Sequence, residues 1–267
     1  MKISIIVTTY NRCGYLNLVL NALKKQRGAG DFEVVIADDG SGPETKELID
    51  VHSLSFPVPL IHAWQEDKGF RASASRNNAF RQSTGDYIIF LDGDCIPADD
   101  FIAKHRSLAE KGFFVSGTRI LLSANFSEKL ESELETLETN NFLCLLKHYW
   151  RRDLNKILSA LHIPIWPRKL HKNNWKKLRS CNFGVWRKDL ISVNGFDENF
   201  IGWGFEDSEL AVRLINFGVK GKAGNFATTV FHLYHKELKT ENCGPGWDRL
   251  MKTIETKKIK CKNGITL

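Results

Sequence analysis

The sequence contains neither a long apolar run nor a closely spaced pair of cysteines. No stretch of roughly 18 apolar residues occurs among its 267 positions, which predicts that the chain has no transmembrane helix. The apolar residues 1–7 are too few for the core of a signal peptide and predict a first strand instead. The six cysteines lack the spacing of a zinc site or a disulfide framework. A reducing cytoplasm is therefore the expected location.

Acidic residues are almost absent between positions 147 and 179. This segment has ten Lys or Arg residues and one acid, Asp153, so it carries +9 in a chain whose net charge is +7. The basic character therefore belongs to one region, which indicates a binding surface. Because Trp150, Trp166 and Trp175 lie among these charges, we expect peripheral contact with the inner face of the plasma membrane. A solvated loop, an acceptor-glycan groove and an RNA-binding surface are the alternatives.

The first half of the chain alternates strand and helix patterns. A content of 42% hydrophobic residues suffices for one large domain. We predict strands at 3–8, 32–37, 58–62 and 87–91, with helices at 15–26, 43–51 and 72–82 between them. Repeated units of this kind predict an α/β fold with a mostly parallel, doubly wound sheet.

The second half is less regular. We predict helices at 99–110, 127–147 and 206–217, and strands at 113–117, 181–186 and 229–233. The last 25 residues are polar and rich in lysine, and we predict a partly mobile tail there.

One predicted strand ends in two carboxylates, in the sequence Asp92-Gly93-Asp94. Open α/β sheets bind their ligands at the carboxyl ends of strands. Two neighbouring carboxylates repel each other unless a cation lies between them. Hard divalent cations use carboxylates together with the phosphates of a substrate, so the motif indicates a metal that holds a phosphorylated ligand. An Asx turn that closes the strand is the alternative.

Two further segments suit a nucleotide. Asp39 follows the strand 32–37, where a carboxylate can accept hydrogen bonds from a base or a ribose, although a helix cap would have the same sequence. Arg71 and Arg76 precede and enter a helix, and their guanidinium groups suit diphosphate oxygens. A solvated helix face is the alternative for both arginines.

The segment 195–207 combines glycines, aromatic residues and acids. Trp203 and Phe205 offer apolar surfaces of the kind on which sugars stack. Glu206 and Asp207 begin a helix, where the helix dipole stabilises negative charge. Downstream, His232 follows an apolar strand and suits the coordination shell of a metal.

Taken in order, these segments resemble family 2 glycosyltransferases with the GT-A fold. The second half resembles the galactosyltransferase-type segment of bacterial chondroitin-type polymerases and β-1,4-galactosyltransferases. The resemblance spans about residues 3–235. It rests on Thr8-Thr9-Tyr10-Asn11, Ala37-Asp38-Asp39-Gly40-Ser41, Gly69-Phe70-Arg71, Ala74-Ser75-Arg76-Asn77, Asp92-Gly93-Asp94, Gly195-Phe196-Asp197-Glu198, Trp203-Gly204-Phe205-Glu206-Asp207 and a downstream His.

The resemblance implies a role for each matching residue. Asp207 would be the catalytic base, and Glu206 would hold a sugar hydroxyl. Mn²⁺ or Mg²⁺ would be held by Asp92, Asp94 and His232, with His235 as the rival of His232. The implied acceptor-binding residues are Trp203, Gly204, Phe205 and Glu206. The implied nucleotide-sugar-binding residues are Thr8, Tyr10, Asp39, Arg71, Asn77, Asp92, Gly93 and Asp94.

The resemblance also implies the domain organisation and the reaction. A single GT-A domain, 1–240, would comprise a nucleotide-sugar half (1–118), a helical basic insertion (119–180) and an acceptor half (181–240), followed by a Lys-rich tail (241–267). The enzyme would transfer a hexose or N-acetylhexosamine from a UDP-sugar to a saccharide or lipid-linked saccharide, with inversion. The expected setting is bacterial surface polysaccharide or lipopolysaccharide synthesis. The alternatives are a nucleotidyltransferase and a non-catalytic RNA- or membrane-binding protein, although no nucleic acid partner is expected.

Overall fold

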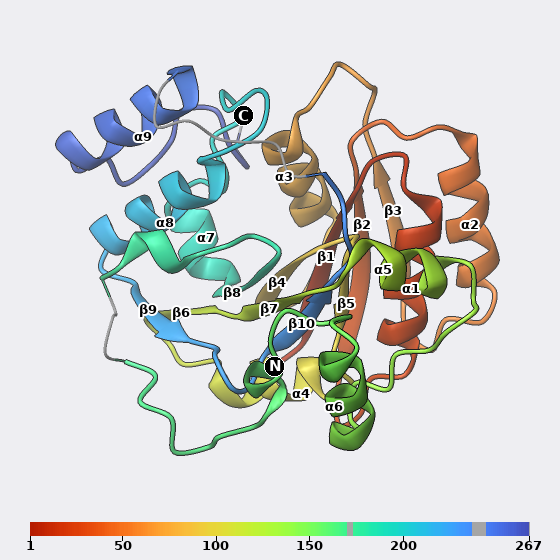
Figure 1. Ribbon diagram of the computed structural model, residues 1–267. Coiled ribbons are helices and arrows are strands. Elements are labelled where there is room, and N and C mark those ends of the chain that lie inside the picture. Colours follow the sequence, from red (N-terminus) through yellow and green to blue (C-terminus); the bar gives the residue numbers. More distant parts are fainter. Residues whose placement is uncertain (170–172, 237–243, 267) are drawn as a thin grey trace.

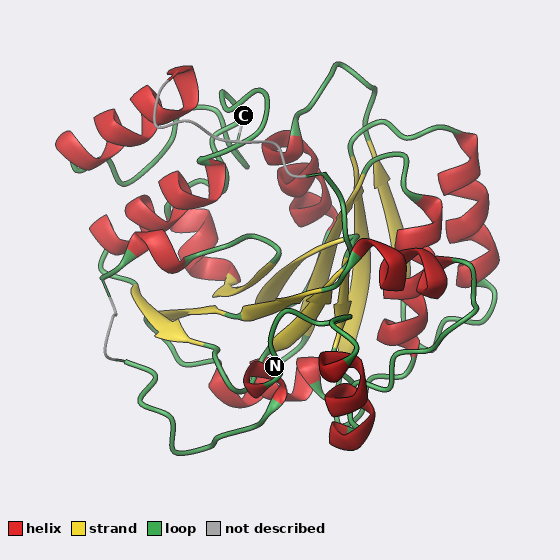
Figure 2. Ribbon diagram, viewed as in Figure 1, coloured by secondary structure: helices red, strands yellow, loops and turns green. Residues whose placement is uncertain are grey.

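A mostly parallel seven-stranded sheet forms the centre of the computed structural model, which describes residues 1–169, 173–236 and 244–266 (Figures 1 and 2). The strand order is β3-β2-β1-β4-β8-β6-β9. Strand β8 is antiparallel to both of its neighbours, and the other pairs are parallel. The strands are β1 (Ile3–Thr9), β2 (Phe32–Asp38), β3 (Leu60–Trp64), β4 (Tyr87–Asp92), β6 (Phe113–Ser116), β8 (Asn182–Trp186) and β9 (Lys220–Ala223).

A second, three-stranded sheet has the order β5-β10-β7. Strand β10 (Thr229–His232) lies between β5 (Cys95–Pro97), to which it is antiparallel, and β7 (Thr118–Leu121), to which it is parallel. Because β5 begins one turn after β4 ends, this small sheet brings β10 beside the end of β4. The predicted α/β fold is confirmed, although β5, β7 and β9 are strands that the sequence pattern did not predict.

The alternation of side chains in the strands builds two apolar layers. Residues such as Ile5 and Ile89 face a core shared with α1, α4, α5 and α6, whereas Ile6 and Phe90 face a core shared with α3, α7 and α8. Helices thus cover both faces of the large sheet, as Figure 2 shows. The helices are α1 (Cys13–Lys24), α2 (Pro43–Ser53), α3 (Ala72–Gln82), α4 (Phe101–Leu108), α5 (Ala124–Glu131), α6 (Phe142–Trp150), α7 (Arg187–Ser192), α8 (Glu206–Asn216) and α9 (Gly244–Glu255), with short 3₁₀ helices η1 (Leu158–Ala160) and η2 (Trp175–Lys177).

The prediction of one long helix at 127–147 is wrong, because two short helices with their own caps replace it. The Ser123 side chain accepts a hydrogen bond from the amide of Phe126 and begins α5. Two residues after α5, Glu133 adopts a left-handed backbone with φ of 57°. The Asn141 side chain then caps α6 by accepting from the amide of Cys144. Local caps therefore override the helical pattern of the sequence.

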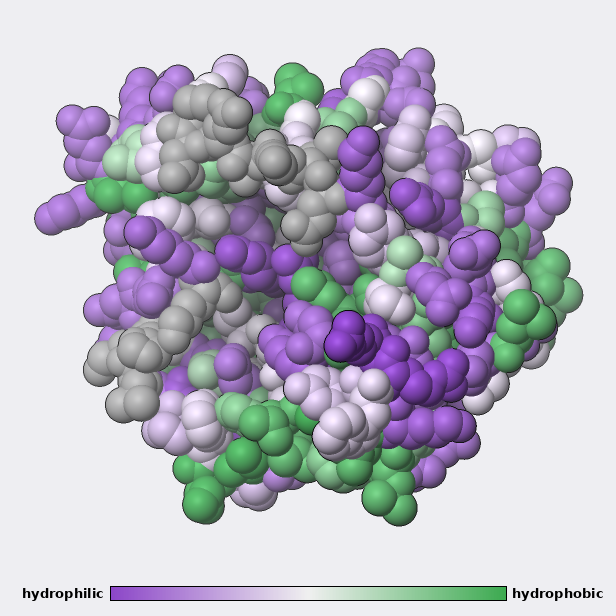
Figure 3. Space-filling model, viewed as in Figure 1, coloured by the Kyte–Doolittle hydropathy of each residue, from purple (hydrophilic) through white to green (hydrophobic). Residues whose placement is uncertain are grey.

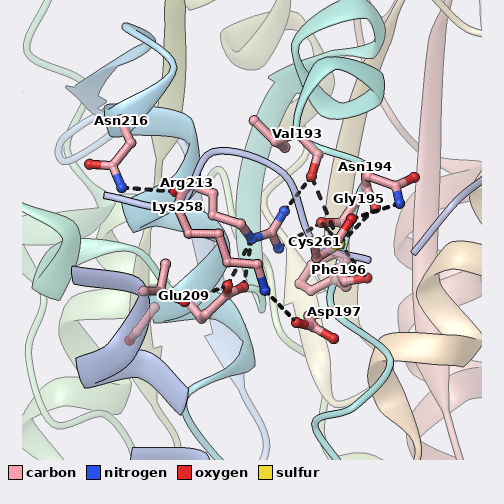
Figure 4. Close-up of polar contacts among 12 residues, drawn as sticks. Val193, Asn194, Gly195, Phe196, Asp197, Glu209, Arg213, Asn216, Lys258 and Cys261 are labelled. Atoms are coloured by element: carbon pink, nitrogen blue, oxygen red, sulfur yellow. Dashed lines mark hydrogen bonds and ion pairs between the residues drawn. The ribbon is translucent and has the colours of Figure 1, made fainter. Parts of the chain in front are cut away.

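The C-terminal residues pack against α8 instead of forming only a mobile tail. Figure 4 shows the buried Arg213 of α8, which pairs with Glu209 and donates to the backbone carbonyls of Val193 and Gly195. The Lys258 ammonium donates to Asp197 at 3.1 Å. Cys261 is buried among carbonyls of residues 193–196. The chain after α9 thereby holds the loop that leads to the predicted acceptor segment.

None of the helices that the structure describes is long and apolar enough to cross a bilayer.

Glu33, a buried carboxylate on β2, makes the stability of the fold depend on pH in the acidic range. Burial would raise the pKa of Glu33, but hydrogen bonds from Lys2, Thr84 and Ser4 outweigh it and lower this pKa to about 2. The stabilisation is complete above the unfolded pKa of about 4.3 and is lost as the pH falls through about 2.

We therefore expect Glu33→Gln to remove on the order of 2 kcal/mol of stability at neutral pH. The difference in the free energy of unfolding between this variant and the unchanged protein should become smaller as the pH falls from about 4.5 to about 2. Urea unfolding at several pH values measures it, with the exposed Glu44→Gln as the matched control. A difference that stays constant over this range would contradict the assignment.

Candidate functional site

The carboxyl ends of β1, β2 and β4 meet at one edge of the sheet, because the three strands are parallel. Thr8 lies opposite Asp92, and Thr9 lies opposite Asp38. The amide of Gly93 donates to the carbonyl of Thr8 at 2.8 Å, so the turn after β4 is fixed against β1. The residues that the sequence placed at strand ends thus come together, as expected for an open α/β sheet.

Three metal-ligating side chains converge at this edge. The ligand atoms of Asp94, His232 and His235 all lie within 4.8 Å of one another. Nε2 of His235 lies 3.3 Å from one Asp94 oxygen, and Nε2 of His232 lies 3.7 Å from the other. The amide of Leu233 donates to the Asp94 carbonyl at 2.8 Å and holds β10 against the turn. One carboxylate and two imidazoles at these distances can hold a divalent cation.

This cluster differs from the predicted set of ligands. The residues predicted to hold the metal were Asp92, Asp94 and His232, and the structure groups His235 with the latter two in place of Asp92. The reason is that β4 ends at Asp92, and the turn at Gly93 and Asp94 separates the two carboxylates. Both histidines lie near Asp94, and which of them binds a metal remains a prediction.

Asp92 instead bonds to a buried arginine that links three parts of the site. The Arg76 guanidinium, on α3, donates to Asp92 at 3.2 Å, to Glu206 at 3.1 Å and to the Thr8 hydroxyl at 3.2 Å. Arg76 is 4% exposed. The sequence interpretation gave this arginine to the diphosphate, whereas here its donors serve two carboxylates and a hydroxyl. It joins the β1 and β4 ends to the start of α8, and no sequence pattern indicated that link.

The carboxylates around Arg76 outnumber this one guanidinium. Burial raises the pKa of Asp92, and Asp94 and Asp207 add to the shift against the opposing effect of Arg76. Burial likewise raises the pKa of Glu206, reinforced by Asp207. An excess of carboxylates at a strand edge favours the binding of a cation.

The predicted catalytic pair begins α8 after a strained turn. Phe205 has φ of 70°, a conformation that is uncommon for a bulky residue and recurs at functional sites. Glu206 points to Arg76, whereas Asp207 accepts hydrogen bonds from the amides of Ser208 and Ser180. Asp207 is half-buried at the N-terminus of the helix, where the dipole stabilises its charge. The two acids thus point to different partners.

Three of the residues predicted to hold the nucleotide, Tyr10, Asp39 and Arg71, lie around the end of β2. Both oxygens of the buried Asp39 accept hydrogen bonds, one from Gln65 at 2.6 Å and one from the Arg71 amide at 2.7 Å. Burial raises the pKa of Asp39. The Arg71 side chain donates to the carbonyl of Glu66, and Tyr10 donates to Asp67 at 3.0 Å. Their nucleotide contacts remain predictions.

Asn77 has a clear positioning role. Its side chain is 1% exposed; it donates to the Phe196 carbonyl and accepts from the Phe196 amide. The side-chain amide of Asn77 also donates to Glu198 at 2.9 Å. These bonds fix the loop before the acceptor segment to α3, and its predicted contact with the nucleotide remains a prediction.

Trp203, one of the predicted acceptor residues, lies on an aromatic rim, whereas Glu206 points to Arg76. Trp203 is 47% exposed, and Phe70 beside it is 44% exposed and accepts from the Gly202 amide. The ring of Phe205 packs edge-on against Trp247 of α9, with centroids 5.3 Å apart. Gly204 lies against Gly246, so α9 supports the turn from behind. The sequence interpretation missed Trp247, because only the packing of α9 brings it there.

Two family models match the chain. The glycosyl transferase family 2 model matches residues 4–184, and the model described as the N-terminal domain of galactosyltransferase matches residues 167–236. Both parts of the predicted resemblance are confirmed.

Two curated relatives are each 28% identical to the chain over the aligned residues. Validoxylamine A glucosyltransferase of Streptomyces hygroscopicus subsp. jinggangensis is 28% identical over 81% of this chain and 52% of that protein. Chondroitin synthase of Escherichia coli is 28% identical over 81% of this chain and 32% of that protein. The chain thus spans about half the length of the first of these relatives and less of the second.

Solved structures show the same fold. S. aureus TarS 1–349 in complex with UDP-GlcNAc superposes with a TM-score of 0.66 at 15% identity, covering 98% of this chain and 68% of that one. The mannosyltransferase PcManGT of Pyrobaculum calidifontis, in complex with GDP-Man and Mn²⁺, superposes with a TM-score of 0.58 at 19% identity. The match covers 88% of this chain and 57% of that one. These neighbours confirm the GT-A architecture.

The family model covers more than half of the chain, and the GT-A fold agrees with it. This chain belongs to glycosyl transferase family 2.

Proposed function

We propose that the protein transfers a hexose or N-acetylhexosamine from a UDP-sugar to a saccharide acceptor, with inversion and with the help of a divalent cation. The observation that carries the proposal is the Asp94, His232 and His235 cluster at the edge where β1 and β4 end. Arg76 bonds both to Asp92, two residues before Asp94, and to Glu206, which supports a single site that includes this cluster and the acids of α8. Neither a nucleotidyltransferase nor a non-catalytic binding protein draws support from the family match.

The donor set fits Mn²⁺ better than Mg²⁺. Mg²⁺ demands oxygen ligands in octahedral geometry, whereas two imidazoles favour a softer transition metal. A cation bound there would offset the charge that develops on the diphosphate leaving group. The neighbour PcManGT was solved with Mn²⁺, in line with this choice.

UDP is the nucleotide that we propose for the donor. TarS was solved with UDP and with UDP-GlcNAc, and chondroitin synthase is among the relatives. Asp39, buried at the end of β2, would accept from the N–H of uracil once the Gln65 amide moves aside. Thr8 and Tyr10 line the same edge.

The acceptor side supplies the base. Asp207 accepts from backbone amides and is half-exposed, so it can take the proton of an acceptor hydroxyl as this oxygen attacks the anomeric carbon. Glu206, held by Arg76, would accept a hydrogen bond from a second hydroxyl. Trp203 on the rim provides an apolar surface for the face of the sugar ring.

A donor screen by thermal shift tests the proposal. With Mn²⁺ present, we expect one of UDP-Gal, UDP-Glc, UDP-GlcNAc and UDP-GalNAc at about 100 times its Kd to add about 2.7 kcal/mol of apparent stability. That corresponds to a rise of roughly 5–10 °C in Tm for a chain of this length. GDP-Man and free NTPs are the matched controls. Stabilisation by an NTP alone, with no response to any UDP-sugar, would indicate a nucleotidyltransferase.

A further inference from the structure

Helix α6 and the loop after it present an unusually apolar surface, formed by residues that the predicted site does not include. Eight large apolar side chains in the described part of the chain are more than 60% exposed, and four of them fall within residues 143–165. These four are Leu143, Trp150, Leu158 and Ile165. Figure 3 shows hydrophobic surface along the lower margin of the molecule, the side on which Figure 1 places α6 and the loop beyond η1. Exposure on this scale marks an interaction surface.

The structure removes the negative charge of the same segment from the surface. Asp153, the one acid between positions 147 and 179, is 5% exposed. It accepts a hydrogen bond from Nδ1 of His148 at 2.9 Å and forms an ion pair with Arg151 at 3.3 Å. Arg151 also pairs with Glu135 at 3.1 Å, so its charge is offset. The outer surface of the segment is left with cations.

Five basic residues of the segment fall into two groups. Arg168 is buried and donates to three backbone carbonyls, and Lys169 pairs with Glu110. These two have structural roles. By contrast, Lys147, Arg152 and Lys156 are exposed and, within residues 1–169, 173–236 and 244–266, have no acidic partner. The unpaired cations therefore lie beside Trp150 and Leu158.

We propose that this surface, the basic-apolar face, docks the protein on an anionic lipid bilayer. We define the face by Lys147, Trp150, Arg152, Lys156, Leu158 and Ile165. Apolar side chains that enter the headgroup region, flanked by Lys and Arg that meet anionic lipids, are what interfacial binding requires.

Other occupants fit this face less well. A second copy would bring the same cations face to face in a symmetric dimer, where they repel. Single-stranded nucleic acid would use the cations and the ring of Trp150, whereas Leu158 and Ile165 are aliphatic and offer it no stacking surface. The anionic bilayer alone uses both the charges and the aliphatic side chains.

The test is co-sedimentation of the full chain with vesicles of phosphatidylcholine, with and without phosphatidylglycerol, in the absence of nucleotide and Mn²⁺. We expect binding to the anionic vesicles only. Each cation near the surface strengthens binding roughly fivefold, so reversing Lys147, Arg152 and Lys156 to Glu should weaken it at least about a hundredfold. The matched control reverses three exposed lysines elsewhere, Lys25, Lys188 and Lys220.

A second measurement reports the apolar part directly. With brominated lipids in the anionic vesicles, the fluorescence of the unchanged protein should be quenched. Trp150→Phe should reduce this quenching, and Ile165→Asp should weaken binding several-fold. All these side chains are exposed, so the variants are expected to keep the Tm of the unchanged protein.

Three results would overturn the proposal. One is the absence of binding to anionic vesicles, and another is an equal loss in the control variant, which would indicate only net charge. The third is a difference in sedimentation mass, without vesicles, between the unchanged protein and the variant with Lys147, Arg152 and Lys156 reversed to Glu. That difference would make a second copy of the chain the occupant. These assays need no sugar transfer, so they are independent of the proposed function. Transfer to a water-soluble saccharide should be unchanged in the variant with Lys147, Arg152 and Lys156 reversed to Glu.

Discussion

Asp94→Asn is expected to lower kcat/KM by at least about a thousandfold and to abolish tight Mn²⁺ binding. Asp94 is the one carboxylate of the ligand cluster, and both imidazoles face it. A metal that offsets leaving-group charge contributes several kcal/mol to the transition state, and about 4 kcal/mol corresponds to a thousandfold. The measurements are steady-state kinetics with the donor found by thermal shift, and calorimetric titration with Mn²⁺.

Two further variants sharpen this result. Asp100→Asn makes the same chemical change at a half-exposed carboxylate before α4 and should leave both quantities unchanged. His235→Gln should weaken Mn²⁺ binding more than Asp92→Asn does, because His235 belongs to the cluster and Asp92 bonds to Arg76. Mn²⁺ affinity that depends on Asp92 and not on His235 would restore the ligand set predicted from the sequence.

Asp207→Asn is expected to lower kcat by about 10²–10⁴-fold while leaving the affinity for UDP nearly unchanged. The side chain lies at the start of α8 with its oxygens held by the amides of Ser180 and Ser208. An amide keeps the shape of the group but cannot accept the acceptor proton. Single-turnover kinetics measures the chemical step, and the thermal shift with UDP and Mn²⁺ measures nucleotide binding.

Glu206→Gln is the matched comparison for Asp207. Glu206 bonds to Arg76 and faces the interior of the site, so its loss should raise the KM for the acceptor and lower the Tm. If kcat in Asp207→Asn stayed within about tenfold of the unchanged enzyme, the base would have to be sought elsewhere. A larger fall in kcat for Glu206→Gln would exchange the two roles.

Most of the fold could be predicted from local sequence. Strands β1, β2 and β4 have apolar runs whose bounds agree with the structure within a residue, and α3 agrees at both ends. The errors occurred where the pattern was weak. The stretch between α5 and α6 was read as helix because Ser123 and Asn141 act as caps only once their neighbours fold.

The site was predicted in part. The sequence identified the carboxylates at the end of β4, the acids that begin α8 and the histidines at the end of β10, since each lies at the end of a recognisable strand or opens a helix. It could not decide which of these groups face one another. Asp94 and His232 are far apart in the chain, and only the pairing of β10 with β5 brings them together.

The sequence by itself determined the chemistry that is present: acids at strand ends, an aromatic segment before the acids of α8, and one basic region. The tertiary structure decided how these groups are paired. Both histidines lie near Asp94, and Asp92 bonds to Arg76. Asp153 is buried, so the basic region presents cations without an acid of its own. The physical reason is that element type follows from local pattern, whereas partners depend on burial and on contacts between distant segments.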